Sequence, residues 1–67
     1  MIFFANNNKG NSIDIKNVVT IMDEDREAFY YLQILTTSGT KIKWEYPSKQ
    51  IRDSDLKELR ELRDKQK

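Results

Sequence analysis

Apolar and polar side chains alternate most clearly between residues 28 and 46 of the chain. Two segments, 28–36 and 40–46, are rich in aromatic and β-branched residues and flank the tripeptide Thr37-Ser38-Gly39. This composition is typical of strands, and a glycine between them is typical of a tight connection. The pattern therefore predicts a β-hairpin.

Two loop lengths are compatible with this hairpin, and each gives a different register. A three-residue loop with Gly39 in the left-handed conformation pairs residues 34 with 42, 32 with 44 and 30 with 46. A two-residue loop requires a positive φ at Ser38, which Asn or Asp accepts more readily than Ser. We favour the three-residue loop, which gathers six apolar or aromatic side chains on one face: Tyr30, Leu32, Ile34, Ile42, Trp44 and Tyr46.

The N-terminal third predicts two more strands. Residues 1–5 are apolar, and the loop-forming segment 6–11 follows them. Residues 12–22 alternate again, with an interruption at Asn17 that predicts a bend or bulge. We expect the first part of this segment to pair with residues 1–5 and the second part to pair with residues 28–36.

The side chains of this N-terminal region can be assigned to a buried face and to solvent. Pairing across the 6–11 loop would set Phe4 beside Ile13 and Ile2 beside Ile15 on one buried face. The charge run at residues 23–27, Asp-Glu-Asp-Arg-Glu, is expected to form a solvated turn at a hairpin tip.

The C-terminal part of the chain predicts a helix over about residues 53–65. Pro47 ends strand pairing because it has no backbone donor, and residues 53–55 are of types that favour a helix N-terminus. The helix carries a narrow apolar stripe, made by Leu56, Leu59 and Leu62. We expect this stripe to pack on the sheet and bury Trp44 beneath it, and we favour that arrangement over a seam for a partner helix.

Together these elements predict an α+β fold, a small antiparallel β-meander of four or five strands with one C-terminal α-helix packed on one face. The 67 residues are expected to form a single domain. A monomer of this size buries only about 60% of its unfolded surface, so self-association as a homodimer is a further expectation.

The composition excludes several kinds of chemistry within one chain. The sequence contains no Cys and no His, which excludes disulfides, thiolate or imidazole metal ligands and histidine-assisted nucleophiles. The acidic run at residues 23–27 lacks the glycine and the ligand spacing of a calcium loop. A meander this small offers no deep pocket for acid–base catalysis. We therefore expect no enzyme activity, no cofactor and no metal.

Charge and hydropathy bear on location and partners. The formal net charge is +1, from 12 basic and 11 acidic residues, which gives no strong field to attract nucleic acid. No apolar run approaches the roughly 20 residues of a membrane span, and residues 1–5 are too short for a signal peptide. We expect a cytoplasmic protein that does not bind membranes. A cysteine-free chain with many Asn, Lys and Ile is typical of phages and mobile elements.

The favoured hairpin register leaves one face of the sheet without a predicted cover. Its side chains are the candidate partner-binding residues: Phe29, Tyr31, Gln33, Leu35, Lys41 and Lys43. Small soluble monomers rarely expose such a patch, so we expect a small adaptor, regulator or inhibitor that binds another protein or a second copy of itself. Aromatic residues beside lysines also suit RNA or single-stranded nucleic acid, which is the alternative. A different register would remove the patch.

The order of elements resembles the carbon storage regulator family of RNA-binding dimers. The resemblance is carried by the short first strand, by Gly10-Asn11-Ser12-Ile13-Asp14-Ile15, and by Arg52-Asp53 before a helix. That family follows its first strand with an Arg-Lys pair, where this chain has Asn6-Asn7-Asn8. Because this departure falls on residues that would contact RNA, the resemblance contributes only to the nucleic-acid alternative.

Overall fold

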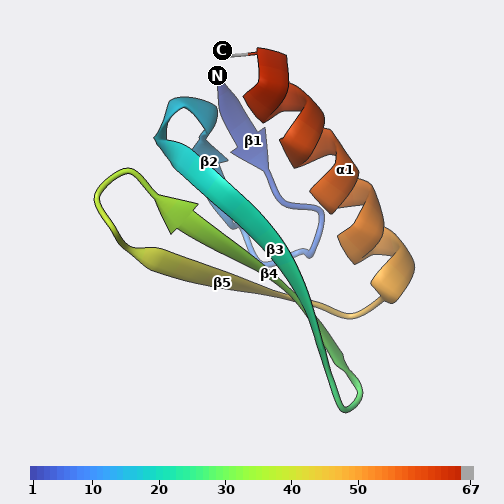
Figure 1. Cartoon of the computed structure of the whole chain (residues 1–67). Helices are drawn as coiled ribbons and strands as arrows, with labels where there is room; N and C mark the ends of the chain where they lie inside the picture. Colours follow the sequence, from blue (N-terminus) through green and yellow to red (C-terminus); the bar gives the residue numbers. More distant parts are fainter. Residues whose placement is uncertain (66–67) are drawn as a thin grey trace.

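The computed structural model describes residues 1–65, which form two antiparallel sheets and one C-terminal α-helix (Figure 1). The smaller sheet consists of β1 (Ile2–Phe4) and β2 (Ser12–Asp14). The larger sheet has the order β3-β4-β5, made by β3 (Val18–Arg26), β4 (Phe29–Thr36) and β5 (Lys41–Tyr46). A 3₁₀ helix, η1 (Ile15–Asn17), joins the sheets, and α1 (Lys49–Lys65) follows β5. The predicted α+β fold is confirmed, with the five strands divided between two sheets.

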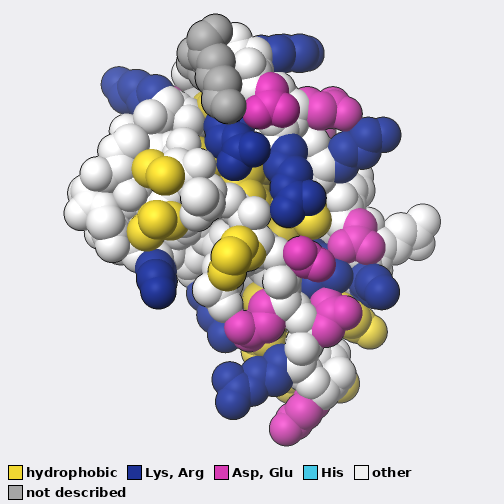
Figure 2. Space-filling view, viewed as in Figure 1, with side chains coloured by type: hydrophobic (Ala, Val, Ile, Leu, Met, Phe, Trp, Pro, Cys, Tyr) yellow, Lys and Arg dark blue, Asp and Glu magenta, His cyan; other side chains and the backbone are white. Residues whose placement is uncertain are grey.

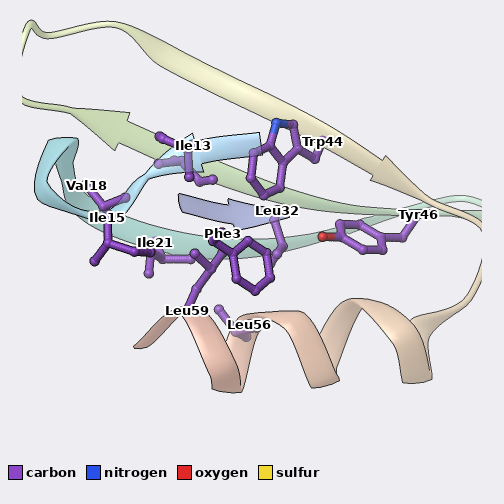
Figure 3. Close-up of a cluster of buried hydrophobic side chains, with 11 residues drawn as sticks. Phe3, Ile13, Ile15, Val18, Ile21, Leu32, Trp44, Tyr46, Leu56 and Leu59 are labelled. Carbon is purple, nitrogen blue, oxygen red and sulfur yellow. The ribbon is translucent and has the colours of Figure 1, made fainter. Parts of the chain in front are cut away.

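The hydrophobic core lies between the inner face of the β3-β4-β5 sheet and a layer made by α1 and the β1–β2 hairpin (Figure 3). Trp44 on β5 is 3% exposed, and its ring stacks on Phe3 of β1 with the centroids 6.2 Å apart. Eleven hydrophobic side chains make up this core: Phe3, Ile13, Ile15, Val18, Ile21, Leu32, Ile34, Trp44, Tyr46, Leu56 and Leu59. Leu62 packs against it, so the expected docking of the leucine stripe on the sheet is confirmed.

The β4–β5 hairpin has the favoured register and loop. Residue 34 pairs with 42, 32 with 44 and 30 with 46. The Thr36 amide donates to the Thr40 carbonyl at 2.9 Å, and the Gly39 amide donates to the Thr36 carbonyl at 2.9 Å. Gly39 has a φ of +86°, a conformation that costs glycine little because it has no Cβ. The three-residue loop therefore sets which side chains face the core.

The predicted pairing of β1 with β2 is wrong by one residue. Phe3, not Phe4, lies opposite Ile13, while Ile2 lies opposite Asp14. Because neighbouring strand residues point to opposite faces, this shift buries Phe3 and leaves Phe4 70% exposed. Three consecutive apolar residues offered no alternation from which to choose a face.

The loop after β1 fixes this register through polar contacts. The side chain of Asn7 is buried, and its amide donates to the Asn11 side chain at 2.8 Å and to the Glu45 carbonyl at 3.0 Å. The Ala5 amide also donates to the Asn11 carbonyl at 2.9 Å. The asparagine-rich loop is therefore attached both to itself and to β5.

The segment 12–22 is not one bent strand. It divides at η1, where the Asp14 side chain caps the short helix by accepting from the Lys16 amide at 3.2 Å. The predicted interruption near Asn17 is thus a helical turn, and a separate register shift lies between Val18 and Thr20. The expectation that the two parts pair with different neighbours is confirmed, since β2 pairs with β1 and β3 pairs with β4.

The acidic run was predicted to form a turn, but most of it belongs to β3. The strand continues to Arg26, and the turn consists of Glu27 and Ala28, with a φ of +56° at Glu27. The extension is stabilised from the inner face, where Asp25 contacts a buried arginine of α1, Arg52. This pairing is between residues distant in sequence, so the local charge pattern did not show it.

The helix begins four residues earlier than predicted. Ser48 precedes its first residue, and the Ser48 hydroxyl accepts from the amides of Gln50 at 3.1 Å and Ile51 at 3.4 Å. Ser48 therefore caps the helix directly after Pro47. Asp53, Ser54 and Asp55 lie inside the helix, and Asp55 is buried.

Arg52 connects α1 to the β3–β4 hairpin. Its side chain is 1% exposed, with Nη1 2.7 Å from Asp25 Oδ1 and Nε 2.8 Å from Asp53 Oδ1. Nη1 also donates to the carbonyls of Glu24 at 3.1 Å and Tyr31 at 3.3 Å. Burial alone would lower the pKa of Arg52, but the hydrogen bonds to Asp53 and Asp25 raise it, so the guanidinium stays charged.

Asp55 connects α1 to both the N-terminal loop and β5. Its Oδ2 accepts from the Asn6 amide at 2.8 Å and from the Tyr46 hydroxyl at 2.6 Å, and its Oδ1 accepts from the Asn6 side chain at 2.6 Å. Burial, together with the hydrogen bond to Asp55, raises the pKa of the Tyr46 hydroxyl far above its ordinary value. Three donors thus satisfy a buried carboxylate without a neighbouring cation in the residues that the structure describes.

We expect Trp44→Ala to lower the free energy of unfolding by about 3–5 kcal/mol, because it removes a large buried ring and the stack on Phe3. Trp44→Phe is the matched control, since it keeps an aromatic ring against Phe3 and should lose less. Urea unfolding monitored by circular dichroism measures both variants. A solvent-like tryptophan emission from the folded wild-type protein would contradict the burial.

Tyr46→Phe is expected to lower stability at neutral pH by about 1.5–3 kcal/mol, since it removes a buried hydrogen bond to a carboxylate. The folded pKa of Tyr46 is raised, so its contribution is complete below the unfolded pKa of 10.0 and is lost as the pH rises above it. Wild-type stability should therefore fall more steeply at alkaline pH than that of the variant. Ultraviolet titration of tyrosinate gives a second readout, and titration of all three tyrosines near the ordinary value would contradict the burial of Tyr46.

Candidate functional site: the outer face of the sheet

The β3-β4-β5 sheet has one covered face and one open face, since α1 and the β1–β2 hairpin both lie on the core side. Strand alternation places the remaining side chains on the open side. We call this surface the outer face and define it by Met22, Glu24, Arg26, Phe29, Tyr31, Gln33, Leu35, Lys41, Lys43 and Glu45. All six candidate partner-binding residues named from the sequence lie on it.

The apolar part of the outer face runs along β4 and onto β3. Met22 is 57% exposed and Phe29 is 47% exposed, while Tyr31 and Leu35 are half-buried by their neighbours. The rings of Phe29 and Tyr31 contact each other at a centroid separation of 6.4 Å. Two large apolar side chains are therefore exposed on this face, which is the kind of surface that other proteins bind.

Ionic contacts cross the centre of the outer face. Lys43 Nζ lies 2.8 Å from Glu24 Oε2 and 4.4 Å from the centroid of the Tyr31 ring. Gln33 donates to Glu24 Oε1 at 2.7 Å. The hydrogen bond from Lys43 lowers the pKa of Glu24, against the opposing effect of desolvation. Lys43 is thus neutralised in place by an acidic residue of β3.

A second ion pair joins the rim of the outer face to the N-terminal loop. Lys9 Nζ lies 3.0 Å from Glu45 Oε1, and both side chains are well exposed. Lys41, by contrast, is exposed beside Leu35 on the neighbouring strand. Figure 2 shows the resulting mixture on one side of the molecule, with separate hydrophobic spots and charges of both signs between them.

A shallow hollow lies on the outer face near the loop between β4 and β5. It has a volume of about 210 Å³ and is lined by Thr20, Met22, Gln33, Ile34, Leu35 and Lys41. Pockets that enclose drug-sized ligands are commonly about 300–1,000 Å³, so this hollow suits a single inserted side chain better than a cofactor.

Other possible sites were compared over the same residues. Within residues 1–65, no cluster of three or more acidic side chains is arranged to hold a metal ion. No helix in that range is long and apolar enough to cross a membrane. The two buried polar clusters, around Arg52 and Asp55, join elements of the fold and are filled by the chain's own groups.

Sequence reasoning missed the contribution of β3 to the outer face. Met22 and Glu24 were assigned to a strand end and a solvated turn, because the acidic run obscured the alternation. The signal was present, since Met22, Glu24 and Arg26 alternate with Asp23 and Asp25. Asp25 faces inward, where it contacts Arg52 of α1.

No family model, no curated protein and no solved structure matches the chain.

The contact between Lys43 and Glu24 predicts a pH response. In the wild-type protein, the Glu24 carboxyl should titrate below its ordinary pKa of 4.5. In Lys43→Gln, which removes the charge and keeps an amide donor, the pKa should move back towards that value. Side-chain carboxyl NMR measures the pKa, and the Lys9→Gln variant, which breaks only the Glu45 pair, is the control. An unchanged Glu24 titration in Lys43→Gln would contradict the proposed contact.

Proposed function

We propose that the protein is a small non-catalytic binding module that recognises another protein through the outer face of its sheet. The observation that carries the proposal is the position of Met22 and Phe29, two large apolar side chains about half exposed on the face that no element of residues 1–65 covers. Adaptors, regulators and inhibitors act through surfaces of this kind, and the cytoplasm is the proposed location.

The charges of the outer face favour a protein over a nucleic acid. Lys43 and Lys9, which would otherwise attract phosphate, are each within 3.0 Å of a glutamate oxygen. A nucleic acid would have to displace these carboxylates or accept their repulsion, whereas a protein surface can provide groups of both signs around an apolar centre. RNA or single-stranded DNA remains the alternative, supported by the aromatic pair of Phe29 and Tyr31.

A second copy of the chain is one partner that the apolar centre would accept. Burying an exposed aromatic or methionine side chain contributes about 1.5–3 kcal/mol before the cost of association. Two copies of Met22 and Phe29 facing each other across a two-fold axis would give a symmetric interface. Homodimers and complexes with a different protein are therefore both included in the proposal.

The test uses Phe29→Lys, which places a charge among the exposed apolar side chains of the outer face without disturbing the core. The matched control is Ile51→Lys, because Ile51 is also an exposed hydrophobic residue, 37% exposed, but lies on α1. We expect Phe29→Lys to abolish association that the wild-type protein and the control retain. Sedimentation equilibrium measures self-association, and site-specific cross-linking in the native host measures capture of a different protein.

The result that would overturn the proposal is equally direct. Equal association and equal cross-linking by wild type and Phe29→Lys would remove the outer face as the interface. A gel shift with single-stranded RNA that weakens steeply with salt, and is lost in Phe29→Lys, would favour the nucleic-acid alternative.

A further inference from the structure

The two edges of the larger sheet differ, and one of them, the edge of β5, borders the outer face. An edge strand presents unpaired backbone N–H and C=O groups that can accept a further strand. β3 and β5 are the two edge strands, because the order of the sheet is β3-β4-β5.

The β3 edge is occupied by side chains of α1. Arg60 Nη2 donates to the Ile21 carbonyl at 3.4 Å, and Arg63 Nη1 donates to the Val19 carbonyl at 3.5 Å. These bonds are long, but the two guanidinium groups lie along the edge and obstruct the approach of another strand. The chain thereby covers this edge itself at Val19 and Ile21.

The β5 edge is open over Lys41 and Lys43. In an antiparallel ladder, hydrogen-bonded and non-hydrogen-bonded pairs alternate, and the bond from the Thr36 amide to the Thr40 carbonyl fixes the phase. Residues 42, 44 and 46 therefore bond to β4, while residues 41, 43 and 45 direct their N–H and C=O groups away from it. The side-chain amide of Asn7 donates to the Glu45 carbonyl at 3.0 Å. Within residues 1–65, the outward groups of Lys41 and Lys43 have no partner.

Each side of this open edge has its own chemistry. On the outer face, the side chains of Lys41 and Lys43 flank the edge. Lys43 is paired with Glu24, whereas Lys41 has no ion pair within the described part of the chain. On the inner face, a hollow of about 360 Å³ adjoins Ile42, with Ile13 of β2 and the hydroxyl residues Thr36 and Thr40 among its lining. An added strand would therefore alternate between a basic side and a partly apolar hollow.

We propose that the β5 edge binds an extended peptide segment in which acidic and apolar residues alternate. Main-chain hydrogen bonds to Lys41 and Lys43 would hold the segment. One acidic side chain would pair with Lys41, a second would compete with Glu24 for Lys43, and an apolar side chain would enter the hollow under Ile42. This interaction uses the backbone edge of β5 together with two lysines of the outer face, and it does not depend on Met22 and Phe29, which carry the proposed function.

The same charges disfavour a second copy of β5 as the occupant. A two-fold axis at Lys43 would set Lys41 opposite Glu45 of the second copy, but the Glu45 end is occupied by the Asn7 contact and the Lys9 ion pair. If the second copy of β5 is shifted towards the loop between β4 and β5, lysines of the two copies lie opposite each other. Like charges in these positions are unfavourable. An acidic strand meets neither obstacle.

The experiment uses a short blocked peptide of alternating Glu and Val, with a Lys–Val peptide of the same length as the charge control. If the Glu residues pair with Lys41 and Lys43, their amides point towards β5 and the Val amides point away. N-methylation of the Glu amides should therefore abolish binding, while N-methylation of the Val amides should leave it intact. Amide hydrogen exchange of Lys41 and Lys43, followed by NMR, should slow at least about tenfold with the Glu–Val peptide.

Substitutions of Lys43 in the protein test the contribution of its backbone N–H to peptide binding. Lys43→Pro removes an outward N–H but no bond of the β4–β5 ladder, and Lys43→Thr loses the same charge and keeps the N–H. We expect the Pro variant to bind at least about tenfold more weakly than the Thr variant, since only the main-chain donor differs. If Lys43→Pro does not fold, the pair of N-methylated peptides still decides the question.

Several results would overturn the proposal. These are the absence of slowed exchange at millimolar Glu–Val peptide, equal binding of the Lys–Val peptide, and indifference to methylation of the Glu amides. Shifts confined to Met22 and Phe29 would assign peptide binding to the outer face. Exchange at Lys41 and Lys43 that is already slow in the peptide-free protein, and that slows further with protein concentration, would assign the edge to a second copy.

Discussion

The Asp55 carboxylate holds three parts of the chain in one place. It lies on α1, accepts two hydrogen bonds from Asn6 in the N-terminal loop, and accepts a third from Tyr46 at the end of β5. A buried carboxylate is costly unless its oxygens are satisfied, so these donors and the carboxylate constrain one another. Arg52, one turn earlier on the helix, fixes the β3–β4 hairpin in the same way. The polar N-terminal half of α1 is thus attached by specific contacts, and the leucine stripe attaches the other half.

These attachments determine which surfaces remain for other molecules. Both covering elements are held on the inner face, so the outer face is left to solvent with its exposed Met22 and Phe29 and its internal ion pairs. The C-terminal half of α1 lies along the edge of β3, whereas the backbone edge of β5 is contacted by Asn7 at Glu45. The asymmetry of the two edges therefore follows from where the helix docks. Surface and edge properties of this small fold both trace back to the contacts of one helix.

The sequence predicted what depends on local alternation and missed what depends on distant partners. Gly39 and the pattern around Trp44 were enough to obtain the register of β4 and β5, and with it most of the outer face. The sequence did not show whether Phe3 or Phe4 is buried, because both faces of β1 are apolar. The contacts of Asn7 in the loop after β1 determine that Phe3 is the buried residue. The helix start was missed because Asp53, Ser54 and Asp55 are of types that favour a helix N-terminus, whereas Ser48 caps the helix and Asp55 is buried by distant partners.

The span of the Asn6–Asp55 contact has a consequence for the order of folding. These residues are 49 positions apart, whereas the two hairpins of the larger sheet close over short loops. Loop-closure entropy favours the local pairs, so the larger sheet can assemble before the β1–β2 hairpin has anything to dock against. During synthesis, Phe3 is made before β3, β4 and β5, and the helix that secures its layer follows all five strands. Until α1 is complete, the nascent chain exposes the ring of Phe3 and the face of Trp44 that it will later cover.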